Sequence, residues 1–252
     1  MNEHKLQGRT ALITGASRGL GKAMALALAE LGARLALVAR DQEALNATAA
    51  EVHKLGAEAK VFVADVGNET QVSQLTKQVN AQLGSVDILI NNAGVNIRKP
   101  ITEFTLEEWN KVLDTNLTSV FLLCRAFVPG MKGHGYGRIV NLSSTMAHVS
   151  IAHRTAYSAS KAAILGITKA LALELAPDGI TVVAISPGPF ATEMNTPLMN
   201  NPEINRQFIA KIPVGRWGKV EEVGKLVAYV CSEEAGFITG TDILIDGGWC
   251  AQ

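Results

Sequence analysis

Tyr157 and Lys161 are the two residues whose types and spacing point most directly to chemistry. They stand four positions apart in a stretch with helical character, and Ser144 precedes the tyrosine by thirteen positions. Residues four apart share one face of a helix, so the phenol and the ammonium can act together. A nearby ammonium favours the phenolate, which allows proton exchange nearer neutral pH than a tyrosine pKa of about 10 permits. The spacing predicts acid–base chemistry on a carbonyl group, with Ser144 beside the same oxygen, although a surface Tyr–Lys pair has the same spacing.

A glycine-rich turn near the amino end supplies a second, independent signal. The sequence TGASRGLG runs from Thr14 to Gly21, between a short apolar segment and a helical pattern that ends at Gly32. Such a turn lets backbone N–H groups approach a phosphate, whose charge the helix N-terminus favours. Its spacing, G-x-x-x-G-x-G, differs from the usual dinucleotide fingerprint G-x-G-x-x-G. An ordinary strand–turn–helix junction is the alternative, and the combination with the Tyr–Lys pair favours a nucleotide site.

Together these motifs resemble those of the short-chain dehydrogenase/reductase family. The matching pieces follow the family's order and span almost the whole chain: TGASRGLG (14–21), NNAG (91–94), Asn116, Ser144, YSASK (157–161), Pro187–Gly188 and DGG (246–248). The resemblance implies an oxidoreductase that interconverts a ketone and a secondary alcohol with a nicotinamide cofactor. It also implies a catalytic set in which no position departs from the family's pattern, namely Asn116, Ser144, Tyr157 and Lys161.

Apolar runs and helical patterns alternate along residues 1–252, which predicts a single α/β domain. The expected architecture is a doubly wound Rossmann domain, with a parallel seven-stranded sheet and helices on both faces. The segment 188–218 breaks the alternation, and in the resembling family it closes over the substrate. Strands are expected near 9–14, 34–39, 59–63, 86–91, 136–142, 180–186 and 241–246, and helices near 20–31, 42–55, 70–83, 105–131, 156–176 and 219–232.

The end of the second strand indicates which cofactor is favoured. An acidic residue there binds the adenosine ribose in a dinucleotide fold, whereas an arginine accepts the 2′-phosphate of NADP. NAD users of the resembling family carry aspartate where this chain has Ala39, and Arg40 follows. With Arg18 in the glycine turn, two guanidiniums are expected to converge on one phosphate. NADP(H) is therefore predicted over NAD, and Asp41, which would favour NAD, stands where a helix N-cap belongs.

The remaining cofactor contacts follow from the resemblance, at strand ends that share one edge of the sheet. It assigns the adenine to Asp65–Val66, close backbone approach to Asn92–Gly94, the nicotinamide to Pro187 and Gly188, and the carboxamide to Thr192. The full predicted set is Gly15, Ser17, Arg18, Gly19, Leu20, Gly21, Arg40, Asp65, Val66, Asn92, Ala93, Gly94, Tyr157, Lys161, Pro187, Gly188 and Thr192.

The four catalytic residues have distinct expected roles. Tyr157 exchanges the proton on the substrate oxygen as general acid or base, and Ser144 hydrogen-bonds that oxygen. Lys161 is expected to lower the tyrosine pKa and, by resemblance, to hold the nicotinamide ribose. Asn116, by resemblance, holds a water that links Lys161 to solvent; its alternative role is to bend the helix 105–131. No metal is expected, because the histidines show no ligand spacing.

The substrate is indicated only by resemblance within the family. NNAGVNIRKPITEF, GRWG at 215–218 and the final DGGW look like the gluconate 5-dehydrogenase branch, in which Arg98 would bind a sugar-acid carboxylate near Ser144 and Tyr157. A solvated surface arginine is the alternative. The 3-oxoacyl reductase branch, whose thioester arrives on a carrier protein, and small-ketone reductases share much of the pattern. A non-catalytic NADP(H) sensor is the alternative from another class, and the intact catalytic set disfavours it.

Composition limits the partners. Lys plus Arg total 23 and Asp plus Glu total 23, so no basic field favours a nucleic acid. No apolar run approaches the roughly 18 residues of a membrane span, and the first residues lack a signal-peptide pattern. A cytoplasmic enzyme acting on a small molecule is expected. The helices near 105–131 and 156–176 are apolar around much of their circumference, and since the family usually forms tetramers through them, a homotetramer is expected.

Overall fold

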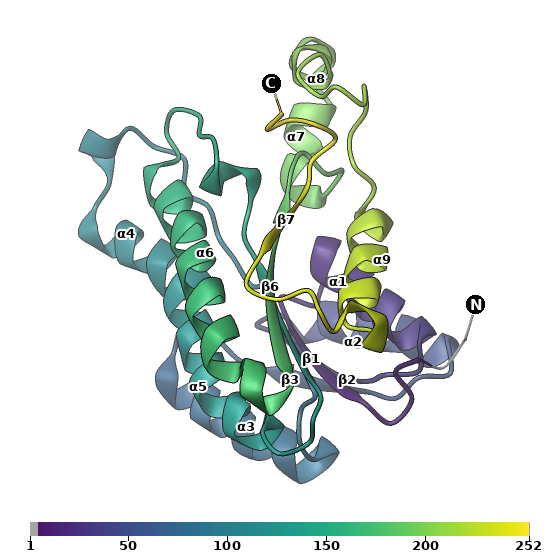
Figure 1. The fold of residues 1–252 in the computed structure, drawn as a ribbon. Helices are drawn as coiled ribbons and strands as arrows, with labels where there is room; N and C mark the ends of the chain where they lie inside the picture. The colour runs from purple at the N-terminus through teal and green to yellow at the C-terminus, as the bar shows by residue number, and fades with distance from the viewer. Residues whose placement is uncertain (1–4, 252) are drawn as a thin grey trace.

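The core of the molecule is one sheet of seven parallel strands (Figure 1). The computed structural model describes residues 5–251. The strands lie in the order β3-β2-β1-β4-β5-β6-β7, which confirms the predicted doubly wound sheet. Their bounds are β1 Thr10–Thr14, β2 Arg34–Ala39, β3 Ala59–Val63, β4 Ile88–Asn91, β5 Gly137–Leu142, β6 Ile180–Pro187 and β7 Asp242–Ile245.

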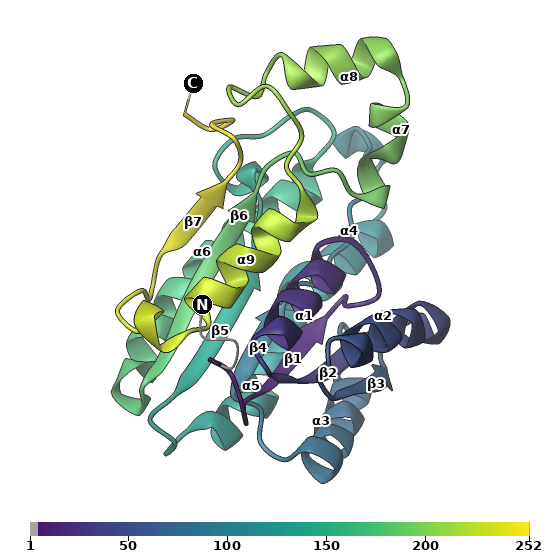
Figure 2. The ribbon, with the colours of Figure 1, turned by 90° about the vertical axis from the view of Figure 1, so that its right-hand side faces the viewer.

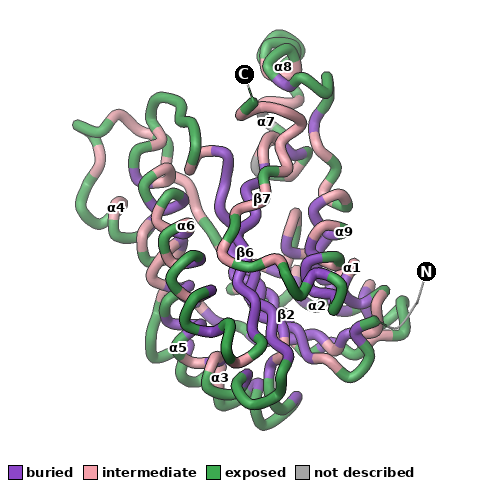
Figure 3. Tube along the Cα trace, viewed as in Figure 1, coloured by how far each residue is buried: buried purple, intermediate pink, exposed green. Residues whose placement is uncertain are grey.

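Helices cover both faces of this sheet (Figure 2). One buried cluster, which includes Met24 and Val227, packs α1, α2 and α9 on one face. A second, which includes Leu75 and Phe127, packs α3, α5 and α6 on the other. The central strands are therefore buried on both sides, as Figure 3 shows, and read as continuous apolar runs. The helices are α1 Gly19–Glu30, α2 Gln42–Lys54, α3 Glu69–Leu83, α4 Leu106–Leu113, α5 Ser119–Met131, α6 Thr155–Leu175, α7 Thr196–Met199, α8 Pro202–Ile209 and α9 Val220–Val230.

Several helices begin and end at the capping residues that the sequence predicts. Asp41 caps α2 by accepting a hydrogen bond from a first-turn N–H at 3.1 Å, so it serves as the N-cap. Thr105 and Glu108 form the predicted capping box of α4. Gly32 follows α1 with a φ of 86°, a left-handed conformation that glycine adopts at little cost.

The long helix predicted over 105–131 is interrupted. A π-helical turn, Asp114–Thr118, joins α4 to α5 and contains Asn116. The apolar spacing continues across this turn, so the sequence pattern does not reveal it; such turns are frequent at functional sites. By length and hydropathy, Leu106–Met131 is the one stretch of the described residues that could cross a membrane. Much of it instead packs against the sheet and α3, as a core helix does.

The segment 188–218 carries α7 and α8, which lie beyond the ends of β6 and β7 (Figure 2). Phe208 of α8 stacks on Trp217, with ring centroids 5.2 Å apart, and on Trp249, with centroids 5.5 Å apart. The Trp217 Nε1 donates to Asn205 Oδ1 at 2.7 Å. This aromatic stack fixes α8 to the C-terminal turn, which gives the predicted substrate segment a defined position.

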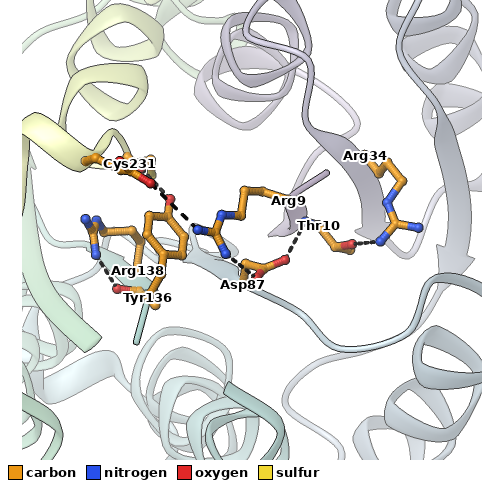
Figure 4. A network of polar contacts seen from close by, with 9 residues as sticks. Arg9, Thr10, Arg34, Asp87, Tyr136, Arg138 and Cys231 are labelled. Atoms are coloured by element: carbon orange, nitrogen blue, oxygen red, sulfur yellow. Dashed lines mark hydrogen bonds and ion pairs between the residues drawn. The ribbon is translucent and has the colours of Figure 1, made fainter. Parts of the chain in front are cut away.

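The opposite edge of the sheet carries a network of polar contacts (Figure 4). The Tyr136 ring lies between two guanidiniums, 3.8 Å from that of Arg9 and 4.2 Å from that of Arg138. The Tyr136 hydroxyl donates to the Cys231 carbonyl, and Arg9 pairs with Asp87 at 3.3 Å. These contacts join the amino ends of β1 and β5 to the end of α9, away from the carboxyl edge where open α/β sheets bind ligands.

This network provides a stability test that is independent of catalysis. Tyr136→Phe removes the donor to the buried Cys231 carbonyl, so the free energy of unfolding should fall by about 1–3 kcal/mol. Turnover at saturating substrate should be unchanged, because the network is remote from the carboxyl edge. Denaturant unfolding and steady-state kinetics measure the two quantities, and wild-type stability in the variant would contradict the assignment.

Candidate active site

The carboxyl ends of β1 and β4 form the centre of the site. The sheet order turns here, since β2 and β3 lie on one side of β1 and β4 to β7 lie on the other. Backbone N–H groups of Asn92 and Ala93 donate to Thr14 Oγ1 at 2.9 and 3.0 Å. The Asn92 Nδ2 donates to the Thr14 carbonyl at 2.8 Å. These bonds hold the glycine turn beside the turn that follows β4.

The glycine turn has the shape that a nucleotide phosphate requires. Gly15 and Gly19 have φ values of 64° and 55°. A Cβ on Gly21 would stand 2.1 Å from the Gly15 carbonyl oxygen, so only glycine lets α1 begin this close to β1. Arg18, the N-cap residue of α1, makes no side-chain capping bond, and the first N–H groups of the helix can therefore donate to an anion. The turn fits the pyrophosphate of a dinucleotide.

Arg18 and Arg40 are the two guanidiniums predicted to bind a 2′-phosphate. Both side chains are exposed, by 73% and 61%. The Arg18 Nη1 lies 3.4 Å from Glu193 Oε2, and the Arg40 Nη1 lies 3.9 Å from Asp65 Oδ2. Exposed pairs contribute only about 0–1 kcal/mol, so a phosphate can displace either carboxylate. Ala39 ends β2, which leaves no acidic side chain at the position that favours NAD.

The other predicted cofactor residues lie at the same edge of the sheet. Pro187 ends β6, and a Cβ on Gly188 would stand 2.7 Å from Asp246. Thr192 borders the glycine turn, with its Cγ2 3.8 Å from where a Cβ on Gly19 would lie. The structure thus places at strand ends, in the loops that follow them or at the start of α1, Ser17, Leu20, Asp65, Val66, Asn92, Ala93, Gly94, Pro187, Gly188 and Thr192.

Ser144, Tyr157 and Lys161 come together where β5 ends and α6 begins. Lys161 is only 4% exposed, and its Nζ donates to the Leu142 carbonyl at 2.6 Å. The same Nζ lies 5.8 Å from the centroid of the Tyr157 ring. Ser144 is 8% exposed and hydrogen-bonds to the Tyr157 side chain, while its Oγ accepts from Met146 N at 3.1 Å. Three of the four predicted catalytic residues therefore share one small region.

Burial dominates the protonation of this pair. Burial raises the pKa of Tyr157 above its ordinary value, and the hydrogen bond from Ser144 acts in the opposite direction. The positive charges of Arg154 and Arg98 also act to lower the pKa of Tyr157. Burial lowers the pKa of Lys161 to about 8. The Lys161 ammonium is directed at the Leu142 carbonyl, and Arg154 and Arg98 are the cations that act on the pKa of the phenol. That Lys161 lowers the pKa of Tyr157 stays a prediction.

Asn116 lies in the π-helical turn and holds the chain that follows β4. Its Oδ1 accepts from Val95 N at 2.8 Å, and its Nδ2 donates to the Val95 carbonyl at 3.0 Å. The same Nδ2 lies 3.0 Å from Ser160 Oγ on α6. The amide thus connects three segments and positions the loop that leads to Arg98. The water relay expected of Asn116 stays a prediction.

An open cavity of about 390 Å³ is bounded by the loop after β4, the residues just before α6, and the helices α7 and α8. Arg98 enters its wall from the loop after β4, and Arg154 enters from the position just before α6. Sequence reasoning selected Arg98 but missed Arg154, although Arg154 precedes Tyr157 by three positions, a spacing that places residues on one helix face. The cavity lining also includes Pro100, Ile151, Ala152, His153, Leu198 and Phe208.

The chain matches known proteins along almost its whole length. A family model described as enoyl-(acyl carrier protein) reductase matches residues 15–250. The 3-oxoacyl-(acyl-carrier-protein) reductase of Vibrio cholerae is 37% identical over 243 residues, which is 96% of this chain and 98% of that protein. A putative gluconate dehydrogenase from Agrobacterium tumefaciens has a TM-score of 0.94 at 38% identity, covering 98% of each chain. A putative 2-deoxy-D-gluconate 3-dehydrogenase from the same organism, with bound NADP, has a TM-score of 0.91 at 33% identity and covers 100% of each.

The buried Lys161 ammonium predicts a measurable dependence of stability on pH. The unfolded chain keeps this proton up to the ordinary lysine pKa of 10.5, whereas the folded protein releases it at about pH 8. Between these values the unfolded state binds more protons, so Lys161 makes the free energy of unfolding rise with pH. Lys161→Met should lack this contribution. Urea unfolding of both proteins between about pH 7 and pH 10 measures it, and a difference that stays constant with pH would contradict the assignment.

Proposed function

The chain belongs to the short-chain dehydrogenase/reductase family, and we propose that it interconverts a carboxylate-bearing ketone and the corresponding secondary alcohol. It is an oxidoreductase that acts on the CH–OH/C=O pair with NADP(H). The observation that supports the substrate class is Arg98, which lines a cavity close enough to Tyr157 for its charge to act on the phenol. The keto-gluconate favoured by the sequence is one member of this class.

The residues proposed to hold NADP(H) fit its charge distribution. The uncapped first turn of α1 can donate to the pyrophosphate, and Arg18 and Arg40 can replace their carboxylate partners with a 2′-phosphate. Lys161 is proposed to hold the nicotinamide ribose. When bound, NADP(H) supplies or accepts the hydride, which the protein has no group to provide.

Tyr157 is the proposed general acid in reduction and general base in oxidation. Burial keeps the phenol protonated, so its hydroxyl can donate to the ketone oxygen as negative charge develops there. The Ser144 hydroxyl gives a second hydrogen bond to the same oxygen. Once the proton has left, the Lys161 ammonium, charged below about pH 8, is proposed to favour the phenolate; its Nζ lies 5.8 Å from the centroid of the Tyr157 ring.

A 3-oxoacyl thioester reductase is the second candidate, which the identity of 37% to the Vibrio cholerae protein of that name supports. The experiment that separates the candidates is a panel of carboxylate-bearing ketones, acetoacetyl thioesters and neutral ketones, each read by the loss of NADPH absorbance. We expect the highest kcat/KM with a carboxylate-bearing ketone. Preference for the thioesters would favour the second candidate, and NADPH binding without turnover would favour a sensor.

We also propose a soluble, cytoplasmic homotetramer. Large apolar side chains are exposed on the helices through which the family assembles, with Leu106 on α4 at 73%, Phe121 on α5 at 51% and Leu173 on α6 at 81%. Exposed apolar side chains of this kind commonly pack against another subunit. Light scattering at several protein concentrations measures the oligomer, and a monomer at all of them would contradict it.

Tyr157→Phe tests the proposed acid–base role. The change removes only the hydroxyl, so turnover should fall by about 10²–10⁴-fold while folding and NADPH binding are retained. Steady-state kinetics and NADPH fluorescence titration measure the two effects. Tyr229→Phe is the matched control, because Tyr229 is 51% exposed on α9. Near-normal turnover of the Tyr157 variant would exclude the mechanism.

Arg40→Ala tests the cofactor assignment. Loss of a charge-assisted hydrogen bond of about 1.5–3 kcal/mol should raise the KM for NADPH by roughly one to two decades. The KM for NADH should change far less, since NADH lacks the 2′-phosphate. Arg206→Ala, on exposed α8, serves as the control for removal of a surface charge. A wild type that prefers NADH, or a variant that loses both cofactors equally, would contradict the assignment.

A further inference from the structure

Arg98 and Arg154 differ from the other arginines of the chain. Among residues 5–251, neither guanidinium has a carboxylate or a hydrogen-bond acceptor from the protein, and both line the same cavity. Every other arginine has such a partner, either a carboxylate or a carbonyl or hydroxyl oxygen: Arg9, Arg18, Arg34, Arg40, Arg125, Arg138, Arg206 and Arg216. The two arginines of the described chain without such a partner therefore line the same cavity.

The two guanidiniums are close enough to repel each other. Burial is the larger cause that lowers the pKa of Arg154, and the charge of Arg98 is the second. His153, in the same lining, has a φ of 66°, a left-handed conformation that is strained for a residue with a side chain. Such strain persists where the surrounding structure imposes it, and it clusters at ligand sites. An anion bound between the two guanidiniums would relieve their repulsion. The strained backbone of His153 lies in the same cavity lining, as expected of a ligand site.

We infer that Arg98 and Arg154 together bind the carboxylate of an oxo acid whose remaining body is a hydrocarbon. This inference rests on the proposed function and narrows its substrate. A planar carboxylate can accept two parallel hydrogen bonds from a guanidinium, and two guanidiniums fix its orientation. Both charges also act on the Tyr157 phenol, so a carboxylate held by them would lie on the side of the cavity that faces the proposed general acid.

The apolar wall of the cavity defines the rest of the substrate. Five of its lining side chains are apolar, and they come from three separate segments: Pro100, Ile151, Ala152, Leu198 and Phe208. Phe208 is fixed by its stacking on Trp217 and Trp249, so this side of the wall is rigid. The remaining lining residues are the two arginines and His153, and among these side chains only the imidazole of His153 can accept a hydrogen bond.

A sugar acid fits such a lining poorly. Hydroxyl groups that lie against apolar side chains lose hydrogen bonds to water and gain none from the wall, which lowers affinity. A hydrocarbon body gains free energy from contact with the apolar wall. The structure therefore assigns an apolar oxo acid, with an alkyl or aryl body, in place of a polyhydroxylated keto-gluconate.

Kinetics with matched substrate pairs test this inference. The pairs are levulinate and its methyl ester, and benzoylpropionate and its methyl ester, with 5-keto-gluconate as the polyhydroxylated acid. We expect kcat/KM to be highest for benzoylpropionate, lower for levulinate, and lower still for the esters and for the keto-gluconate. Arg154→Met should lower kcat/KM for the acids by about tenfold to a hundredfold, mainly through KM. The esters should lose much less, because for them the variant removes only the action of this charge on Tyr157.

Two further variants distinguish an effect of the Arg154 charge from a structural role of its side chain. Arg154→Lys keeps the charge but loses the planar fork, so it should recover part of the activity on the acids. Arg206→Met removes a charge from α8 outside the cavity and should change neither substrate class. Equal losses with acids and esters in Arg154→Met would show a structural role and overturn the inference. A wild type that prefers the esters or the keto-gluconate would overturn it as well.

A binding measurement keeps the inference testable even if no ketone is reduced. Phenylbutyrate has the carboxylate and the aryl body but no ketone, and calorimetry with the NADP⁺-loaded protein measures its affinity against that of its methyl ester. Preferential binding of the acid that is lost in both Arg98→Met and Arg154→Met would support the carboxylate site. Failure to reduce any ketone would then reject the proposed reaction but not this site. Equal affinity for acid and ester would overturn the site itself.

Discussion

The candidate active site is built around a buried ammonium group. Lys161 is 4% exposed, and removing a charge from water is so costly that it requires compensating polar contacts. The Leu142 carbonyl, at the end of β5, provides one such contact at 2.6 Å. This contact is possible only if α6 starts close to the end of β5, and that placement also brings Ser144 and Tyr157 together. The fold that accommodates the lysine thereby brings together the residues of the proposed acid–base group.

The sheet order then determines which other segments lie beside the proposed acid–base group. The glycine turn follows β1, and the hydrogen bonds between Thr14 and Asn92 hold it next to the turn after β4. Asn116 continues this connection by joining Val95 to α6. One chain of short contacts thus links the proposed phosphate site, the proposed proton donor and the loop that carries Arg98. Positioning through these backbone contacts explains why residues from distant parts of the sequence meet at one edge.

Regular local patterns made most of the fold predictable. Alternating apolar and helical runs determined the sheet, and capping residues such as Asp41 and Thr105 marked helix starts, because these signals act over a few residues. The π-helical turn Asp114–Thr118 was not predictable, since the apolar spacing continues through it. The orientation of the Lys161 ammonium and the meaning of Arg154 depend on contacts between distant segments. The cavity that joins Arg154 to Arg98 exists only once α6 and the loop after β4 are in place.

Hydride transfer from NADPH to a ketone carbon, with the proton supplied by the protein, is the central claim. The most direct measurement uses NADPH deuterated at one or the other hydrogen of the reactive nicotinamide carbon, with the ketone that gives the highest kcat/KM. Mass spectrometry and NMR of the alcohol product then locate the label. The geometry described here predicts one deuterium, on the carbinol carbon, from only one of the two labelled cofactors. An alcohol without deuterium from both labelled cofactors, or no alcohol from any ketone, would contradict it.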